Sequence, residues 1–184
     1  MVNSYGCAKA PDNFQKYSSN DPELNISLDY ISGWLHAEQK GANGSFNQVV
    51  FYKPKVDKKD TSKVAMMVVT VEPISKMTLE EKTLQSVTDY LIAKRMKFQS
   101  AKVISRSDIN IKNFKMSAAV ELLLSYRTLD KLYVANSKLI MFKERIVIFQ
   151  YQDKFYTLRY ENKEEEFDKF NKAFSRLIDS LIIK

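Results

Sequence analysis

The sequence is poor in the residues that most often carry chemistry. Its 184 residues include one histidine, one cysteine, four glycines and four prolines. A single cysteine permits no intramolecular disulfide. With so few glycines, a glycine-rich loop that cradles phosphate is implausible. The patterns GxSxG, HExxH, CxxC and the P-loop do not occur, so hydrolase and kinase functions lose their usual sequence support.

Long apolar runs are also missing. No run approaches the roughly 20 residues that a membrane-spanning helix needs, and the apolar positions are periodic instead. Hydrophobic residues still make up 45% of the chain, which at this length predicts one domain with a substantial core. Residues 1–22 mix Gly, Pro, Asn, Ser and charged residues without periodicity. We expect them to form a flexible leader, with residues 23–184 as the single domain.

The net charge of +7 is unevenly distributed. Residues 1–60 carry seven basic and seven acidic side chains, whereas residues 94–159 carry 14 basic and 5 acidic ones. Such a region could form a basic face that attracts an anionic membrane, nucleic acid or an acidic protein. Because its cations are spread over several expected strands and loops, a solvated sheet face is the favoured interpretation.

The C-terminal segment has the clearest local pattern. Two runs rich in β-branched and aromatic residues, 146–151 and 155–160, predict a hairpin. Asn162 stands three residues before Glu165, which predicts a capping box and a helix start in this acidic run. Apolar residues then recur at spacings of three and four, so the helix should cover a sheet. These residues are Phe167, Phe170, Ala173, Phe174, Leu177, Ile178, Leu181 and Ile182.

The rest of the chain supplies more strands and one more helix. Thr78 followed by Glu81 predicts a second capping box, with a helix to about Met96 that buries Leu84, Val87, Leu91 and Tyr90. Alternating or apolar runs predict strands at 24–30, 48–53, 63–73, 101–111 and 116–126, with 63–73 in a central position. This order predicts an α+β domain with an antiparallel sheet and helices packed on it, not a Rossmann domain.

Few residues are candidates for a site. His36 could be a general base or metal ligand, but no second histidine or cysteine lies at ligand spacing, so a surface histidine is favoured. The acidic run Glu164 to Glu166 could bind Ca²⁺ or Mg²⁺, yet its place at a helix start favours capping. Aromatic and basic residues interleave in 138–160, as in sheets that stack single-stranded nucleic acid, although such aromatics more often belong to the core.

Several short strings together resemble the PsbP-like family. They are LDYISGW, VVFYKP, VVTVEP followed by TLEE, and the closing YQDKFYTLRYENKEEEFDKFNKAFSRLIDSL. The family includes the extrinsic PsbP subunit of photosystem II, bacterial PsbP-like secreted proteins and lipoproteins, and a Ran-binding relative in nuclear transport. The resemblance implies an α/β/α sandwich around an antiparallel sheet, no enzymatic activity, and no transferable catalytic, cofactor or metal residues.

The resemblance also suggests a location and a class of partner. Many bacterial members are exported and lipid-anchored, so Cys7 is a candidate lipidation site, with a free cysteine in a flexible leader as the alternative. We expect an extracytoplasmic accessory protein that docks to a membrane-associated protein partner through the basic sheet face or the loops at 41–60. A cytoplasmic location stays open. The alternatives are a small enzyme or ligand carrier with a cleft between sheet and helix and, less favoured, a module that binds nucleic acid or a small GTPase.

Overall fold

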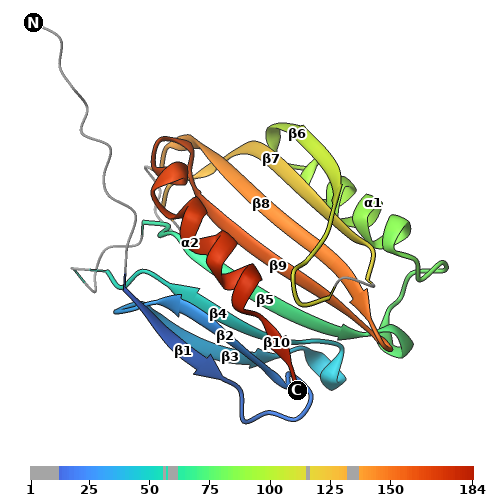
Figure 1. Cartoon of the computed structure of the whole chain (residues 1–184). Coiled ribbons are helices and arrows are strands. Elements are labelled where there is room, and N and C mark those ends of the chain that lie inside the picture. The colour runs from blue at the N-terminus through green and yellow to red at the C-terminus, as the bar shows by residue number, and fades with distance from the viewer. Residues whose placement is uncertain (1–12, 56, 58–61, 115–116, 132–136) are drawn as a thin grey trace, which may run out of the picture.

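The chain folds into two antiparallel sheets and two α-helices (Figure 1). The computed structural model describes residues 13–55, 57, 62–114, 117–131 and 137–184. The strands are β1 (Phe14–Ser18), β2 (Ile26–Ile31), β3 (Leu35–Lys40), β4 (Asn47–Tyr52), β5 (Met66–Pro73), β6 (Gln99–Ile109), β7 (Ala119–Leu129), β8 (Leu139–Tyr151), β9 (Lys154–Lys163) and β10 (Ile182–Ile183). The helices are α1 (Leu84–Arg95) and α2 (Phe167–Ser180), and short 3₁₀ turns are η1 (Ala42–Gly44), η2 (Ile74–Lys76) and η3 (Glu164–Glu166).

The larger sheet has seven strands in the order β3-β4-β5-β9-β8-β7-β6. Every neighbouring pair is antiparallel, which confirms the predicted sheet type. Strand β5 lies inside the sheet, as its apolar sequence predicts. The predicted hairpin forms from β8 and β9, which are joined by Gln152 and Asp153. Gln152 has a φ of 55°, because a two-residue hairpin connection favours positive φ.

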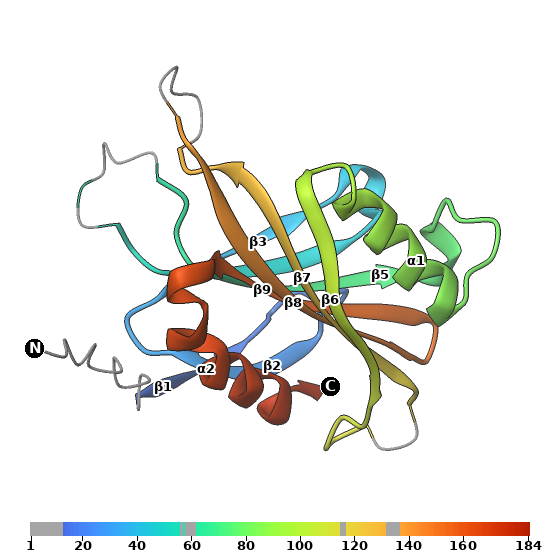
Figure 2. The same ribbon diagram turned by 90° about the horizontal axis from the view of Figure 1, so that it is seen from above.

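The seven-stranded sheet is covered on both faces (Figures 1 and 2). Helix α2 and the smaller sheet, of order β1-β2-β10, pack on one face, and α1 packs on the other. Alternation along β9 supplies both cores, since Tyr156, Leu158 and Tyr160 belong to the cluster under α2 and Phe155 to the cluster under α1. The predicted α+β sandwich, with helices on both faces of an antiparallel sheet, is confirmed.

Helix α2 has the predicted apolar stripe, but it begins later than predicted. Ala173, Phe174, Leu177 and Ile178 are buried against the sheet. Asn162 does not cap the helix, because it lies in β9, where its side-chain amide donates to the backbone oxygen of Glu166 at 3.0 Å. The acidic run forms η3 instead, and α2 starts at Phe167. The predicted capping box of Asn162 and Glu165 therefore does not form, because Asn162 is buried beneath η3.

Helix α1 also starts later than predicted. Its capping box is formed by Thr83 and Ser86, with a bond of 3.1 Å from the Ser86 amide to the Thr83 hydroxyl, and not by Thr78 and Glu81. Thr83 lies five residues after Thr78, and the segment between them precedes α1. Val87 is buried as predicted, whereas Tyr90 is half exposed, so its predicted burial is wrong.

Three strands lie where the sequence predicts none. Strand β10 contains Ile182, whose predicted place in the buried stripe of the last helix is wrong, because α2 ends at Ser180 and Ile182 pairs with Ser27 of β2 and is 48% exposed. Strand β1 is within the expected leader, so the fold begins before residue 23. It pairs with β2 and buries Tyr17, whose hydroxyl hydrogen-bonds Glu38 of β3. Strand β3 has mostly exposed, polar side chains and therefore shows no apolar alternation. Its backbone pairing with β4, at the edge of the sheet, makes it a strand.

Candidate functional site

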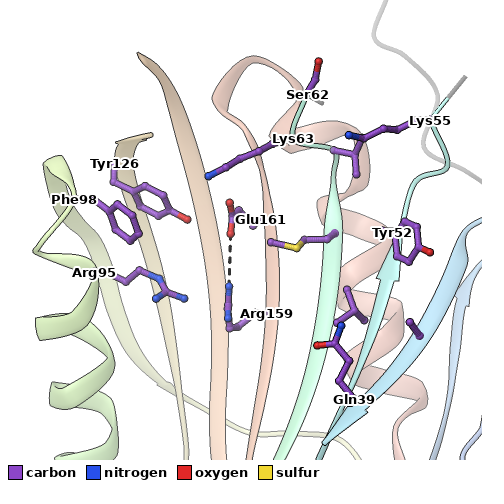
Figure 3. A pocket seen from close by; sticks show the side chains of 14 residues that line it. Gln39, Tyr52, Lys55, Ser62, Lys63, Arg95, Phe98, Tyr126, Arg159 and Glu161 are labelled. Atoms are coloured by element: carbon purple, nitrogen blue, oxygen red, sulfur yellow. Dashed lines mark ion pairs between the residues drawn. The ribbon is translucent and has the colours of Figure 1, made fainter. Parts of the chain in front are cut away.

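Helix α1 covers only part of its sheet face. It packs on β7 and β8, and a pocket of about 690 Å³ lies beside it over β3, β4, β5 and β9 (Figure 3). Strand alternation places one set of side chains from each of these strands in the pocket. The apolar members are Ala37, Val50, Tyr52, Val64 and Met66 on one side, and Phe98 and Tyr126 on the other. The volume is within the range usual for small-molecule sites.

Phe98 and Tyr126 form the wall of the pocket next to α1. Their rings stack with centroids 4.8 Å apart and an interplanar angle of 19°. Tyr126 is buried in β7, whereas Phe98, just before β6, is 41% exposed. The stacking on buried Tyr126 fixes the position of the partly exposed Phe98 ring at the edge of the pocket.

A buried ionic cluster lies at the base of this wall. The carboxylate of Glu144 is 0% exposed and accepts two hydrogen bonds from Arg95, from Nε at 2.5 Å and from Nη2 at 2.9 Å. Arg159 Nε donates to the same carboxylate at 2.6 Å. Arg159 Nη2 also lies 3.6 Å from the carboxylate of Glu161 (Figure 3). The cluster joins the last residue of α1 to β8 and β9, so it fixes the end of the helix that borders the pocket.

The two carboxylates of the cluster have opposite pKa shifts. Burial alone would raise the pKa of Glu144, but the guanidiniums of Arg159 and Arg95 outweigh it and lower that pKa. Burial, followed by repulsion from Glu144, raises the pKa of Glu161, and Arg159 offsets this only in part. Burial also raises the pKa of Tyr126, so its hydroxyl keeps its proton at neutral pH. Glu144 is therefore held in its ionised form, whereas the surroundings of Glu161 disfavour its ionised form.

The pocket is lined by apolar side chains, several cations and one carboxylate, that of Glu161. Glu144 is engaged by two guanidiniums, and the described residues that line the pocket include neither a cysteine nor a histidine. In the part of the chain that the structure describes, no group of three or more His, Cys, Asp or Glu residues could hold a metal ion. What the pocket offers is apolar area together with the cations Lys55, Lys63, Arg95 and Arg159.

His36 lies on the other face of the sheet from this pocket. Its neighbours in β3, Ala37 and Gln39, line the pocket, so alternation turns His36 toward the smaller sheet. There Nδ1 lies 3.2 Å from the hydroxyl of Tyr30. His36 is exposed, as predicted, but on a strand and not in a loop. His36 therefore does not line this pocket, whereas a carboxylate, that of Glu161, does.

The other predicted site residues lie apart from the pocket or outside the described residues. Cys7 is outside them, as is part of the 41–60 region, at 56 and 58–60. Glu164 and Glu166 pair with Lys143 at 3.3 Å and Lys169 at 2.9 Å. Ion pairs formed by these lysines account for two carboxylates of the acidic run without a metal.

Several basic residues of 94–159 and most of the aromatic residues of the hairpin have structural roles. Arg95, Arg106, Arg145 and Arg159 all form ion pairs, which neutralises part of the basic excess. Tyr151 is partly buried against the core, and the other five aromatic side chains of 138–160 are core residues, exposed by 2% or less. They are Phe142, Phe149, Phe155, Tyr156 and Tyr160. A stacking platform built from them is excluded because their rings are inside the protein.

The ionic cluster is the part of the site that the sequence analysis misses. Arg95 is at a helix C-terminus, where a cation is expected from the helix dipole alone. Glu144 is a charged residue in phase with the apolar residues Ile146 and Ile148 on one face of β8, which is the available signal for a buried charge. Its partners come from α1 and from β9, and only the sheet register brings them together.

Comparison with solved structures identifies the fold of this chain. No family model and no curated protein matches the sequence. Among solved structures, cyanobacterial PsbP (CyanoP) from Synechocystis sp. PCC 6803 superposes with a TM-score of 0.60 and 17% identity, covering 100% of this chain and 98% of that one. The chain has the PsbP-like fold. The resemblance predicted from the short sequence strings is confirmed at this level.

Two further structures extend the comparison to other settings. Mog1p, a Ran-binding protein of Saccharomyces cerevisiae, has a TM-score of 0.58 and 6% identity, with 93% of this chain and 95% of that one covered. LpqN, involved in cell envelope biogenesis in Mycobacterium tuberculosis, has a TM-score of 0.56 and 14% identity, with 94% and 92% covered. The PsbP-like fold therefore serves in unrelated cellular roles, and identity this low shows the fold alone.

The described helices do not include one that is long and apolar enough to cross a membrane.

Proposed function

We propose that this chain is a non-enzymatic accessory protein that binds a membrane-associated protein partner outside the cytoplasm. The observation that carries the binding function is the open half of the sheet face beside α1. Its apolar side chains are half buried over β3, β4 and β5, and exposed Phe98 borders them. A pocket with apolar walls and convergent polar groups is the usual form of a binding site.

Two further points support binding over catalysis. The carboxylate at the base of the pocket, Glu144, is neutralised by Arg95 and Arg159, so it is held as a structural anion and not as a proton carrier. Proteins with the same fold include one named for binding Ran and one tied to cell envelope biogenesis. The envelope role of that second protein supports the proposed location outside the cytoplasm, and Cys7 is the proposed site of a lipid anchor.

The partner is tested by cross-linking from the pocket in cells. A photoreactive amino acid replaces Tyr52, which lines the pocket, and in a matched variant it replaces Lys172, which is exposed on α2 across the sheet. We expect a membrane-associated protein to be captured from position 52 and not from 172. Capture of the same proteins from both positions, or of none from 52, would contradict a docking site here.

The location is tested separately. Protease added to intact cells of the native host, with the outer envelope opened where there is one, should digest this protein but not a cytoplasmic marker. A protected protein would refute the extracytoplasmic location and leave the binding site untouched. Mass spectrometry of the native N-terminal peptide should show a lipid on Cys7, and an unmodified thiol there would refute the anchor.

A second candidate function is a carrier of a small ligand. It is favoured by the volume of the pocket, about 690 Å³, and by the aromatic wall of Phe98 and Tyr126. This function needs no protein partner. A pocket that binds no small molecule in a screen of apolar and amphiphilic compounds would count against it.

A further inference from the structure

Strand β3 forms one free edge of the seven-stranded sheet, next to the pocket. Ala37 and Gln39 of this strand line the pocket, and Figure 3 shows Gln39 on the side away from α1. Leu35 follows the same alternation, so its half-exposed side chain lies on this face too. The pocket therefore extends to the edge of the sheet, where β3 has no further neighbouring strand among the described residues.

The outer backbone groups of β3 have no backbone partner in the described part of the chain. One side of the strand pairs with β4 from Leu35 to Lys40 without a register shift. No other backbone hydrogen bond joins residues 35–40 to the described residues. All of these residues except Ala37 are exposed, so the unpaired N–H and C=O groups lie at the protein surface. Such a row of donors and acceptors is what an added β-strand hydrogen-bonds.

The other free edge of the sheet, on β6, has features that hinder strand addition. Strand β6 pairs with β7 through two register irregularities, and it carries exposed Lys102, Arg106 and Asp108. Bulges and charges of this kind protect an edge from pairing with another chain. Because β3 pairs with β4 in an unbroken register, its edge is the one that another strand can extend.

The charged residues of β3 are directed away from the pocket. On the other face of the strand, the carboxylate of Glu38 accepts a hydrogen bond from the hydroxyl of Tyr17. The ammonium of Lys40 pairs with Asp21 at 2.8 Å. The pocket face of β3 is therefore uncharged, and an apolar strand can lie beside it without burying an unpaired charge.

The small side chain of Ala37 leaves room for a longer side chain to reach the pocket floor. Ala37 pairs with Val50 of β4, and both residues line the pocket. Neighbouring strands lie about 4.8 Å apart, so a strand added beside β3 would be about 10 Å from β4. A long apolar side chain opposite Ala37 can cross it and contact Val50, whereas a short one cannot. The pocket thus favours an aromatic or long aliphatic residue at that position.

A second copy of this chain fits the edge less well than a different protein does. We consider antiparallel pairing of two β3 strands in the two most central registers. Pairing about Ala37 places alanine opposite alanine, so no side chain reaches Val50. Pairing about Glu38 places two carboxylates directly opposite each other, which is destabilising. Self-pairing therefore leaves the pocket unfilled or brings like charges together.

We propose that β3 is the docking edge for an extended segment of a protein partner, which adds a strand to the sheet and inserts an aromatic or long aliphatic side chain, opposite Ala37, into the pocket. This inference rests on the proposed function of binding a protein partner and names the form that the partner takes. Backbone hydrogen bonds supply the affinity of such a complex, and the inserted side chain supplies its specificity.

A synthetic peptide and the full chain test the mode of binding. The probe is acetyl-Gln-Thr-Phe-Thr-Leu-Thr-amide, which in an antiparallel register places its phenylalanine opposite Ala37. Two further peptides are N-methylated at alternate amides, one at Phe and Leu and the other at the first two Thr. Because only every second residue of a strand turns its N–H toward β3, we expect one methylated peptide to bind at least about tenfold more weakly and the other to bind as the parent does.

Amide hydrogen exchange in the wild type measures the edge directly and depends on no variant. In the free protein, the β3 amides that face outward should exchange fast and those bonded to β4 slowly. With the parent peptide bound, exchange of the outward β3 amides should slow by at least about tenfold, because they become hydrogen-bonded. Exchange of the β6 amides should not change.

Two variants locate the site. Ala37→Arg places a long charged side chain between the added strand and Val50, and we expect the parent peptide to bind at least about tenfold more weakly. Ser107→Arg adds the same charge at an exposed position of the β6 edge and should bind the peptide as the wild type does. In the wild type, a peptide with alanine in place of phenylalanine should also bind at least about tenfold more weakly, since it loses the inserted ring.

The outcomes separate this inference from the function beneath it. Equal affinity of the two methylated peptides, or unchanged exchange of the outward β3 amides, would overturn strand addition. If no peptide binds at about millimolar concentration while position 52 captures a membrane-associated protein, strand addition fails and the proposed function stands. If the peptide binds as expected while position 52 captures nothing, strand addition at β3 is supported and the proposed partner is refuted.

Discussion

The Glu144→Gln variant removes the anion that holds two guanidiniums of the pocket together. The wild-type carboxylate is 0% exposed and accepts bonds of 2.5, 2.6 and 2.9 Å from Arg95 and Arg159. Glutamine has nearly the same shape, but its amide nitrogen is a donor that would face donors. Because the substitution changes charge and leaves volume almost the same, cavity formation contributes little to the expected effect.

The magnitude depends on which arginine can return to water. The Arg159 side chain is 24% exposed, so it can turn toward solvent. The Arg95 side chain is 9% exposed and belongs to the last residue of α1, so its charge stays buried without a counter-ion. Breaking a buried ion pair by removing one partner typically costs about 3–5 kcal/mol. For a chain of this size, that loss lowers the Tm by about 6–20 °C.

Urea unfolding followed by circular dichroism measures the effect, since urea does not screen charge. The matched control is Asp89→Asn, which removes a partner of Arg106 from an exposed pair of 3.1 Å and should cost less than about 1 kcal/mol. The double variant Arg95→Met with Glu144→Leu should be more stable than Glu144→Gln, because an apolar replacement leaves no buried charge from α1. Equal losses for Glu144→Gln and Asp89→Asn would refute the structural role of the cluster.

Three other substitutions test separate parts of the fold. Glu161→Gln should be more stable than the wild type at pH 7, because the raised pKa of Glu161 means that the folded state disfavours its ionised form; the advantage should shrink as the pH falls through that raised pKa and be gone near the unfolded-state pKa of about 4.5. Urea midpoints that show no gain at pH 7 would contradict this. Leu177→Ala, in the buried stripe of α2, should lose about 2–5 kcal/mol in thermal unfolding, and a loss below about 1 would be inconsistent with its full burial. Ser125→Ala should be neutral or slightly stabilising although the residue is 0% exposed, because its hydroxyl has no hydrogen-bond partner among the described residues; a marked loss of stability would reveal a partner.

Local patterns predicted the elements whose stability comes from an apolar face. The hairpin of β8 and β9 and the stripe of α2 were predicted correctly because a period of two or of about 3.6 residues marks which side chains must leave water. Strand β3 has no such mark, since it is held by backbone pairing at a sheet edge. The helix starts were misplaced because several Thr, Asn and Glu residues satisfy the same capping pattern, and tertiary packing selects one of them.

The sequence by itself determined the fold class and the absence of the common catalytic motifs, because these follow from periodicity, composition and short strings within one segment. Only the tertiary structure decided the site. The pocket exists because α1 covers β7 and β8 and stops short of β3, β4 and β5, a matter of helix placement that no local pattern records. Likewise, Arg95 is 49 residues from Glu144, and Arg159 is 15 residues from it. Packing of α1 on the sheet brings Arg95 to Glu144, and the register of β8 and β9 brings Arg159.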